Sequence, residues 1–134
     1  MDNLTKEQRR ICMSRIRSKN TKPEKIVRKI LTQFGLRYRL HNTKLPGKPD
    51  IVISRIKTIL FVNGCFWHQH KGCKRRAIPK ANTEYWSKKL KRNVEKQKED
   101  IKLLKKDGWK VYIIWECETK DENRLIKKLK RILL

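Results

Sequence analysis

The sequence predicts a single mixed α/β domain in which helices pack against a small, largely buried β-sheet. Several short runs are apolar and β-branched, as is typical of strands in the centre of a sheet. Between and around them lie segments whose apolar residues recur with helical spacing. Neither an internal repeat nor a linker divides the 134 residues, so we expect one domain over 1–134. The strand runs are Asp50–Ile53, Thr58–Gly64 and Trp109–Trp115.

The predicted helices carry recognisable start and stop signals. In Thr21–Gly35, Thr21 can act as the N-cap and Glu24 completes a Thr-x-x-Glu capping box, while Gly35 ends the helix. A long helix is expected over Thr83–Asp107, and a second capping box, Thr119–Glu122, opens the last one. With a strand over Leu36–His41, the predicted order is helix–β–β–β–helix–β–helix.

Residues 1–20 read as a basic N-terminal arm or helix. Their apolar residues Ile11, Met13 and Ile16 are too sparse to define a core face. Whether this arm is ordered on its own stays open at this point.

The charge balance indicates a polyanionic partner. The chain has 37 Lys and Arg against 13 Asp and Glu, a formal net charge of +24, and nucleic acid is the usual partner of so basic a domain. A membrane surface is the rival, but the sequence lacks a run of about 18 apolar residues and a secretory signal. We therefore expect a soluble, intracellular protein with no membrane partner.

The stretch Asn63–Cys73, "NGCFWHQHKGC", indicates a metal site. Clustered cysteines beside histidines favour metal over disulfides in a reducing compartment. Zinc takes four N or S ligands, and the candidates are Cys12, Cys65, His68, His70, Cys73 and Cys117. We exclude Cys12, which lies on the arm, and prefer His70 to His68 because it is nearer Cys73. The alternative is a set of unligated thiols and exposed histidines.

Two acids stand alone in a basic region. From Gln8 to Thr83 only Glu24 and Asp50 are acidic, among 20 Lys and Arg. Asp50 opens an apolar strand, where Asp is uncommon, although a turn or strand-edge role is the alternative. The capping box alone explains Glu24.

A phosphodiester hydrolase would use these groups together. Asp50 would hold Mg²⁺, and His68, free of the zinc, would take a proton from the attacking water. The zinc would be structural only.

Four motifs together resemble the very short patch repair (Vsr-type) mismatch endonucleases. They are "CMSRIRSKNTKPE", "LPGKPDIVI", "VNGCFWHQHKGC" and "GWKVYIIWEC", and the resemblance runs from about Met13 to Cys117. It implies a variant of the restriction-endonuclease fold with a mixed central sheet. It also implies nicking of duplex DNA 5′ to the thymine of a T:G mismatch, the lesion left when 5-methylcytosine deaminates. The partner would be double-stranded DNA, the protein a monomer, and the location the prokaryotic cytoplasm at the nucleoid.

The resemblance assigns roles to matching positions. Asp50 matches the magnesium-binding aspartate, the carbonyl of Val62 a second metal contact, His68 the catalytic histidine, and Glu24 an acid near the metal waters. The zinc ligands implied are Cys65, His70, Cys73 and Cys117, in agreement with the spacing. Asn63 departs from the family, whose best-known members have histidine there. Its amide can donate a hydrogen bond to a phosphate but cannot carry a proton.

The resemblance also implies an aromatic wedge. Phe66, Trp67 and Trp86 would intercalate from the major-groove side and Met13 from the other, with Lys and Arg of Lys19–Lys29 and Lys74–Lys80 on phosphates. From its pattern alone, Trp86 is better explained as a core residue, because it starts the apolar stripe of the long helix.

Two other functions compete with this one. The first is a sequence-specific restriction-type endonuclease. The second is a non-catalytic zinc module that only binds nucleic acid.

Overall fold

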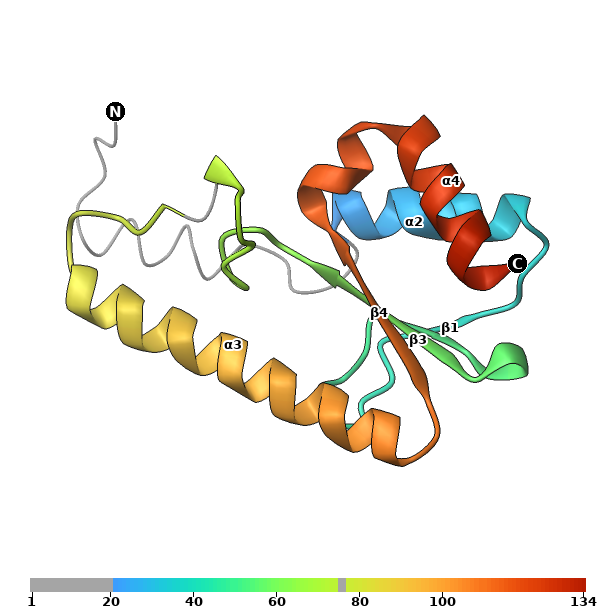
Figure 1. Cartoon of the computed structure of the whole chain (residues 1–134), viewed down its shortest axis with the longest axis horizontal. Helices are drawn as coiled ribbons and strands as arrows, with labels where there is room; N and C mark the ends of the chain where they lie inside the picture. The colour runs from blue at the N-terminus through green and yellow to red at the C-terminus, as the bar shows by residue number, and fades with distance from the viewer. Residues whose placement is uncertain (1–20, 75–76) are drawn as a thin grey trace.

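The protein forms a four-stranded sheet with helices on both faces, as Figure 1 shows. The structure is a computed structural model that describes residues 21–74 and 77–134. The predictions for Met13, Cys12 and the rest of 1–20 fall outside these ranges. The elements are α2 (Lys22–Gln33), β1 (Arg39–Leu40), β2 (Ile51–Ile53), η1 (Ser54–Ile56), β3 (Thr58–Asn63), α3 (Thr83–Lys106), β4 (Lys110–Trp115), η3 (Glu116–Lys120) and α4 (Glu122–Leu133). The predicted mixed α/β class is confirmed.

The sheet is mixed, with the order β1-β2-β3-β4. Strand β2 pairs antiparallel with both β1 and β3, whereas β3 and β4 run parallel and are connected through α3. The register places Asn63, the last residue of β3, opposite Trp115, the last residue of β4. The segments that follow these two strands therefore begin at the same edge of the sheet.

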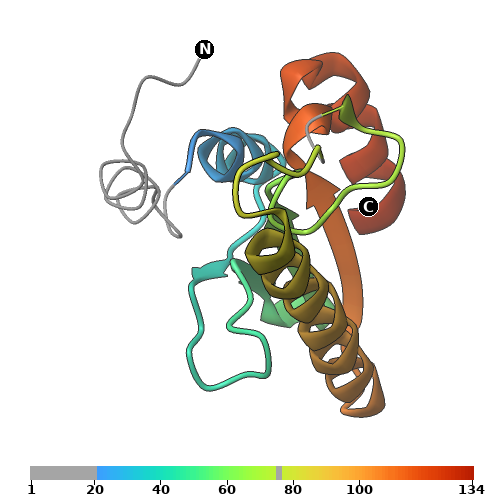
Figure 2. The same cartoon turned by 90° about the vertical axis from the view of Figure 1, so that its left-hand side faces the viewer.

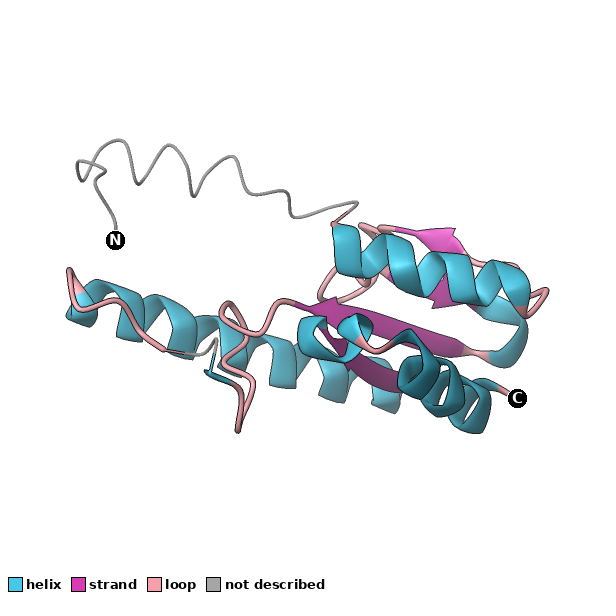
Figure 3. Ribbon diagram, turned by 90° about the horizontal axis from the view of Figure 1, so that it is seen from above, coloured by secondary structure: helices cyan, strands magenta, loops and turns pink. Residues whose placement is uncertain are grey.

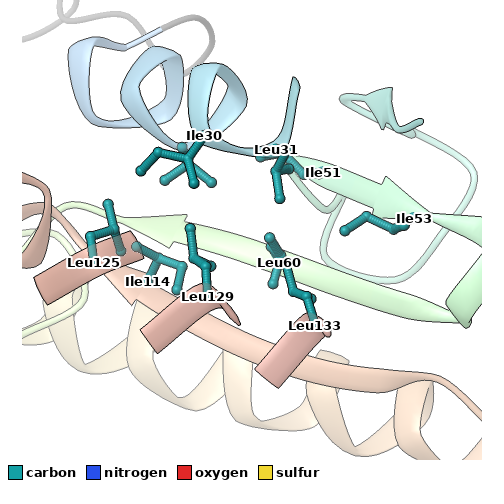
Figure 4. Packing of buried hydrophobic residues seen from close by; sticks show 10 residues of the cluster. Ile30, Leu31, Ile51, Ile53, Leu60, Ile114, Leu125, Leu129 and Leu133 are labelled. Carbon is teal, nitrogen blue, oxygen red and sulfur yellow. The ribbon is translucent and has the colours of Figure 1, made fainter. Parts of the chain in front are cut away.

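The core has two layers, one on each face of the sheet. Helices α2 and α4 cover one face and α3 covers the other (Figures 1 and 3). Alternation along the strands divides the apolar side chains between these layers, because successive residues of a strand point to opposite faces. Figure 4 shows the layer against α2 and α4, formed by Ile30, Leu31, Ile51, Ile53, Leu60, Ile114, Leu125, Leu129 and Leu133.

The start of α2 agrees with the prediction, but the start of α4 does not. Thr21 Oγ1 accepts a hydrogen bond from the Glu24 N–H at 3.4 Å. The N-cap of α4 is Asp121, whose Oδ1 accepts from the Arg124 N–H at 3.2 Å. The capping box predicted at Thr119 is wrong, because Thr119 lies in η3 and its hydroxyl donates to the Glu116 carbonyl at 2.7 Å.

Strand β1 is shorter than the predicted strand over Leu36–His41. Only Arg39 and Leu40 pair, with Val52 and Ile51 of β2. Strand β2 turns into η1 after Ile53, so a longer β1 has little strand to pair with. The connection from β1 to β2 loops away from the sheet (Figure 2). In the described ranges of the chain, no helix is both long and apolar enough to cross a membrane.

Candidate active site and metal centre

The predicted metal ligands meet at the edge where β3 and β4 end. Cys65 lies two residues after Asn63, and Cys117 lies two residues after Trp115, so the parallel register brings the two thiols to the same edge. The loop that follows β3 supplies His70 and Cys73. One ligand atom from each of these four residues lies within 4.8 Å of the others.

The spacing of these ligand atoms fits tetrahedral zinc. His70 Nδ1 is 3.7 Å from Cys65 Sγ and 3.4 Å from Cys117 Sγ. Zinc at about 2.3 Å from sulfur and about 2.0 Å from nitrogen holds such atoms roughly 3.5 Å apart. Three thiols and one imidazole are also a donor set that zinc prefers. The cysteines are not joined by disulfides.

The surroundings of Cys65 disfavour a free thiolate. Burial raises the pKa of Cys65 to about 12, and the neighbouring thiols add to the rise. A metal ion offsets this effect, because it stabilises the thiolate that burial disfavours. The His70 ring stacks on Trp115, with centroids 4.1 Å apart and planes at 7°, so β4 orients the imidazole.

The predicted catalytic residues line a cleft of about 850 Å³ at the same edge. Asp50, Val62, Asn63 and His68 line it. Phe66 and Trp67 also face it. Glu24 joins this group through His41, another residue of the cleft wall. Further lining residues are Thr21, Pro23, Thr43, Gly47, Lys48, Phe61, Gly64, Gln97 and Glu116.

Asp50 is held at the floor of this cleft. It precedes β2, and its Oδ2 accepts a hydrogen bond from the Val62 N–H of β3 at 2.8 Å. Burial raises the pKa of Asp50 to about 6, and the negative charge of Glu24 adds to the rise, whereas the Val62 N–H opposes it. The carboxylate is thus mostly ionised at pH 7 but is poorly stabilised without a cation.

Glu24 pairs with a residue that the sequence interpretation missed. Its side chain is 1% exposed, and its Oε1 lies 2.5 Å from His41 Nε2. Glu24, His41 and Asp50 each place a ligand atom within 4.8 Å of the others. No local pattern in the sequence indicates His41. It becomes part of the site because Leu40 pairs with Ile51, which puts His41 opposite Asp50.

His68 is half-buried in the wall of the cleft. Its Nδ1 is buried and has no hydrogen-bond partner among the residues that the structure describes. Burial lowers the pKa of His68, so the imidazole is neutral near pH 7 and can accept a proton.

Asn63 makes a reciprocal amide pair with Gln97 of α3. Asn63 Nδ2 donates to Gln97 Oε1 at 2.7 Å, and Gln97 Nε2 donates to Asn63 Oδ1 at 2.9 Å. Asn63 is 2% exposed. Sequence interpretation suggested a phosphate contact for this amide, and the pair directs one N–H and the carbonyl of Asn63 toward α3.

Replacing Gln97 with Ala will lower the free energy of unfolding by about 1–3 kcal/mol, because it leaves the buried amide of Asn63 without its partner. Urea unfolding measures the change. Lys98→Ala, at an exposed position of the same helix, is the matched control and should stay within about 0.5 kcal/mol of the unmodified protein. Equal stability of the two variants would contradict a structural role for the pair.

The predicted wedge residues form one aromatic cluster. Phe66 contacts Trp67 and Trp86 edge-on, with centroids 5.2 and 5.7 Å apart. Trp86 is 8% exposed and packs against Tyr85, which is 57% exposed. The Lys89 ammonium lies 5.6 Å from the Trp67 ring centroid. The structure thus brings Phe66, Trp67 and Trp86 together beside the cleft, with Trp86 as the buried base of the cluster.

Comparison with known proteins gives consistent matches. The family model described as DNA mismatch endonuclease Vsr matches residues 1–75. The Type II nicking enzyme V.XorIIP of Xanthomonas oryzae pv. oryzae is 45% identical over 132 residues, which cover 98% of this chain and 96% of that protein. The Type II nicking enzyme V.NmeAIP of Neisseria meningitidis is 43% identical, covering 96% of each chain.

A mismatch endonuclease is also among the relatives. The DNA mismatch endonuclease Vsr of Escherichia coli is 38% identical over 113 residues, which cover 84% of this chain and 72% of that protein. The family model spans more than half of the 134 residues, and these relatives cover most of the chain. The chain therefore belongs to the Vsr family and is a DNA endonuclease.

Proposed function

We propose that the protein is a Mg²⁺-dependent endonuclease that nicks duplex DNA 5′ to the thymine of a T:G mismatch. The observation that carries this proposal is the single cleft in which Asp50, Val62 and His68 lie beside the exposed edge of the aromatic cluster. Such nicking would initiate repair of deaminated 5-methylcytosine. The protein would act as a monomer in the prokaryotic cytoplasm.

In this proposal Asp50 and the carbonyl of Val62 hold Mg²⁺, which would neutralise charge on the scissile phosphate. The Val62 N–H donates to Asp50 Oδ2 at 2.8 Å, which holds the Asp50 carboxylate beside β3 and supports its role as a metal ligand. Neutral His68 takes a proton from the attacking water. Glu24 lies close enough to Asp50 to orient water beside the ion.

Zinc would have a structural role. Cys65, His70, Cys73 and Cys117 would supply all four ligands that a structural zinc takes, which would leave no position for a substrate. The loop that they hold also carries His68, Phe66 and Trp67, so zinc would position both the proton acceptor and the wedge. In a restriction-endonuclease-like fold, which we propose for this sheet and its helices, the cleft opens at the end of the central strands.

The aromatic cluster would supply selectivity. Phe66 and Trp67 are only partly buried and rest on Trp86. Apolar side chains inserted between base steps unstack the duplex, and a mismatched step resists this less than a paired one. Trp86, which is buried under Phe66 and Trp67, would support these two rings or shift outward to intercalate when DNA binds. Met13 would insert from the opposite side. Lys19–Lys29 and Lys74–Lys80 would contact phosphates.

A second candidate is sequence-specific nicking of fully paired DNA. It is favoured by the names of the two relatives at 45% and 43% identity, which are Type II nicking enzymes. The first candidate, a mismatch-specific endonuclease, is favoured by the description of the family and by the name of the E. coli relative.

A panel of duplexes with identical flanking bases separates the two candidates. One duplex carries T:G, one T:A and one C:G at the same position, and kcat/KM is measured for each with Mg²⁺. The proposal predicts that T:G is preferred by at least about tenfold, because unstacking and unpairing a base costs a few kcal/mol and costs least at a mismatch. Cleavage of a paired duplex as fast as T:G, lost when the flanking bases are changed, would establish the sequence-specific candidate. Binding without cleavage of any duplex, in several flanking contexts, would indicate a non-catalytic module.

A further inference from the structure

His41 is placed in the cleft by the backbone of the sheet. It follows β1, and its N–H donates to the Asp50 carbonyl at 3.0 Å, so the two residues face each other across the ladder. Its φ of +49° is in the left-handed region, which a residue with a Cβ seldom adopts. Such backbone conformations are retained at functional sites more than elsewhere. The backbone of His41 is thus held next to Asp50, and its imidazole contacts the Glu24 carboxylate.

The distance between His41 and Glu24 identifies the contact as a hydrogen bond. Nε2 and Oε1 are 2.5 Å apart. Two ligands of one octahedral ion at about 2.1 Å would lie roughly 3.0 Å apart. The thiol cluster, in contrast, already has the separations of a metal site, at 3.4 and 3.7 Å. His41 is therefore hydrogen-bonded to Glu24 itself.

A carboxylate as buried as Glu24 keeps its position only while a partner bonds it. Glu24 comes from the first turn of α2, whereas Asp50 comes from the sheet. The two carboxyl groups repel each other, and the charge of Glu24 contributes to the raised pKa of Asp50. His41 lies between these elements and is fixed to Asp50 through its backbone and to Glu24 through its ring.

We propose that His41 is a positioning residue that orients the Glu24 carboxylate toward the metal held by Asp50. The inference rests on the proposed function and deepens it. His41 does not touch the reacting phosphate. Its role is to direct the acceptor atoms of Glu24 to the water around the metal, as outer-shell histidines do in other metal sites. The site then comprises three protein side chains near the metal, from α2, the end of β1 and the start of β2.

Three variants test this role. His41→Ala removes the hydrogen bond, and His41→Gln restores an N–H donor on a flexible side chain of similar reach. Both carry a Cβ, so the left-handed backbone strains them alike, and their difference reports the hydrogen bond. Tyr38→Phe is the matched control. Tyr38, just before β1, shares a hydrogen bond of 3.2 Å with Thr32 of α2, and this bond lies outside the cleft.

The measurements are the single-turnover nicking rate of a T:G duplex, its half-saturating Mg²⁺ concentration, the Kd for DNA, and Mg²⁺ binding by calorimetry. We expect His41→Ala to slow nicking and to raise the Mg²⁺ requirement, each by about 10- to 100-fold, with an unchanged Kd for DNA. His41→Gln should recover most of both losses, and Tyr38→Phe should behave as the unmodified protein.

Two results would overturn the inference. One is a His41→Ala protein with unaltered rate and Mg²⁺ requirement. The other is a His41→Gln protein as defective as His41→Ala. If the unmodified protein does not nick DNA, the proposed function fails, and calorimetry then decides the inference alone. Weaker Mg²⁺ binding by His41→Ala than by His41→Gln supports it, and equal binding by the two overturns it.

Discussion

Replacing Asp50 with Asn will abolish nicking while it stabilises the metal-free protein. The loss of rate should be on the order of 1000-fold or more, because a metal ligand at the scissile phosphate contributes several kcal/mol to the transition state. DNA binding should persist or strengthen, since one negative charge is removed from a surface that binds a polyanion. Single-turnover cleavage and a binding titration on the same preparation measure both effects.

The gain in stability follows from the raised pKa of Asp50. The folded state binds the proton more tightly than the unfolded chain, with a pKa of about 6 against 3.8. The ionised carboxylate therefore lowers stability above pH 6, and this loss fades as the pH falls from 6 to 3.8. Removing the charge should add up to about 3 kcal/mol at pH 8 and little at pH 4.

Urea unfolding of both proteins in Mg²⁺-free buffer, compared at each of several pH values, measures this gain. Added Mg²⁺ should stabilise the unmodified protein and not the Asp50→Asn protein. Asp107→Asn, at an exposed position after α3, is the control and should show no such pH dependence. An Asp50→Asn protein that is less stable at pH 8 would contradict the account of a poorly solvated carboxylate.

Cys117→Ser will release zinc and lower the melting temperature. Cys117 ties the loop after β3 to the end of β4, and its Sγ lies 3.4 Å from His70 Nδ1. Because a structural zinc ion contributes folding free energy directly, the loss should be several kcal/mol, which is a fall of at least about 10 °C. Metal analysis and calorimetry measure the two effects.

The matched control for zinc release is Cys12→Ser, at the cysteine that the sequence interpretation excluded from the ligand set. It should keep one zinc per chain and its melting temperature. Full zinc content in Cys117→Ser would show that the ligand set is wrong. Loss of zinc with an unchanged melting temperature would show that the zinc does not stabilise the fold.

Local patterns singled out most of the residues that the structure brings together, because these residues lie next to strand ends. Cys65 and Cys117 each come after an apolar run, and the end of a strand is a place that sequence periodicity identifies. Asp50 was detectable as an acid that opens a strand. The helix that starts at Thr21 was evident from its cap, although the same motif at Thr119 failed, since Asp121 competes with it two residues later.

What the sequence did not indicate depends on register and on distant contacts. His41 becomes a site residue only when β1 pairs with β2 so that it faces Asp50. Asn63 and Gln97 are 34 residues apart, and no local signal links them. Whether Trp86 is core or wedge could not be decided from its helical spacing, because the cluster with Phe66 and Trp67 gives it both a buried position and a place beside the cleft.

The most direct measurement maps the cut in a duplex with one T:G mismatch, labelled in turn on each strand. The unmodified protein with Mg²⁺ is compared with the same protein in EDTA and with Asp50→Asn. We expect one nick, 5′ to the mismatched thymine, that is absent in both comparisons. A nick on the guanine strand, cleavage of both strands, or cleavage by Asp50→Asn would contradict it.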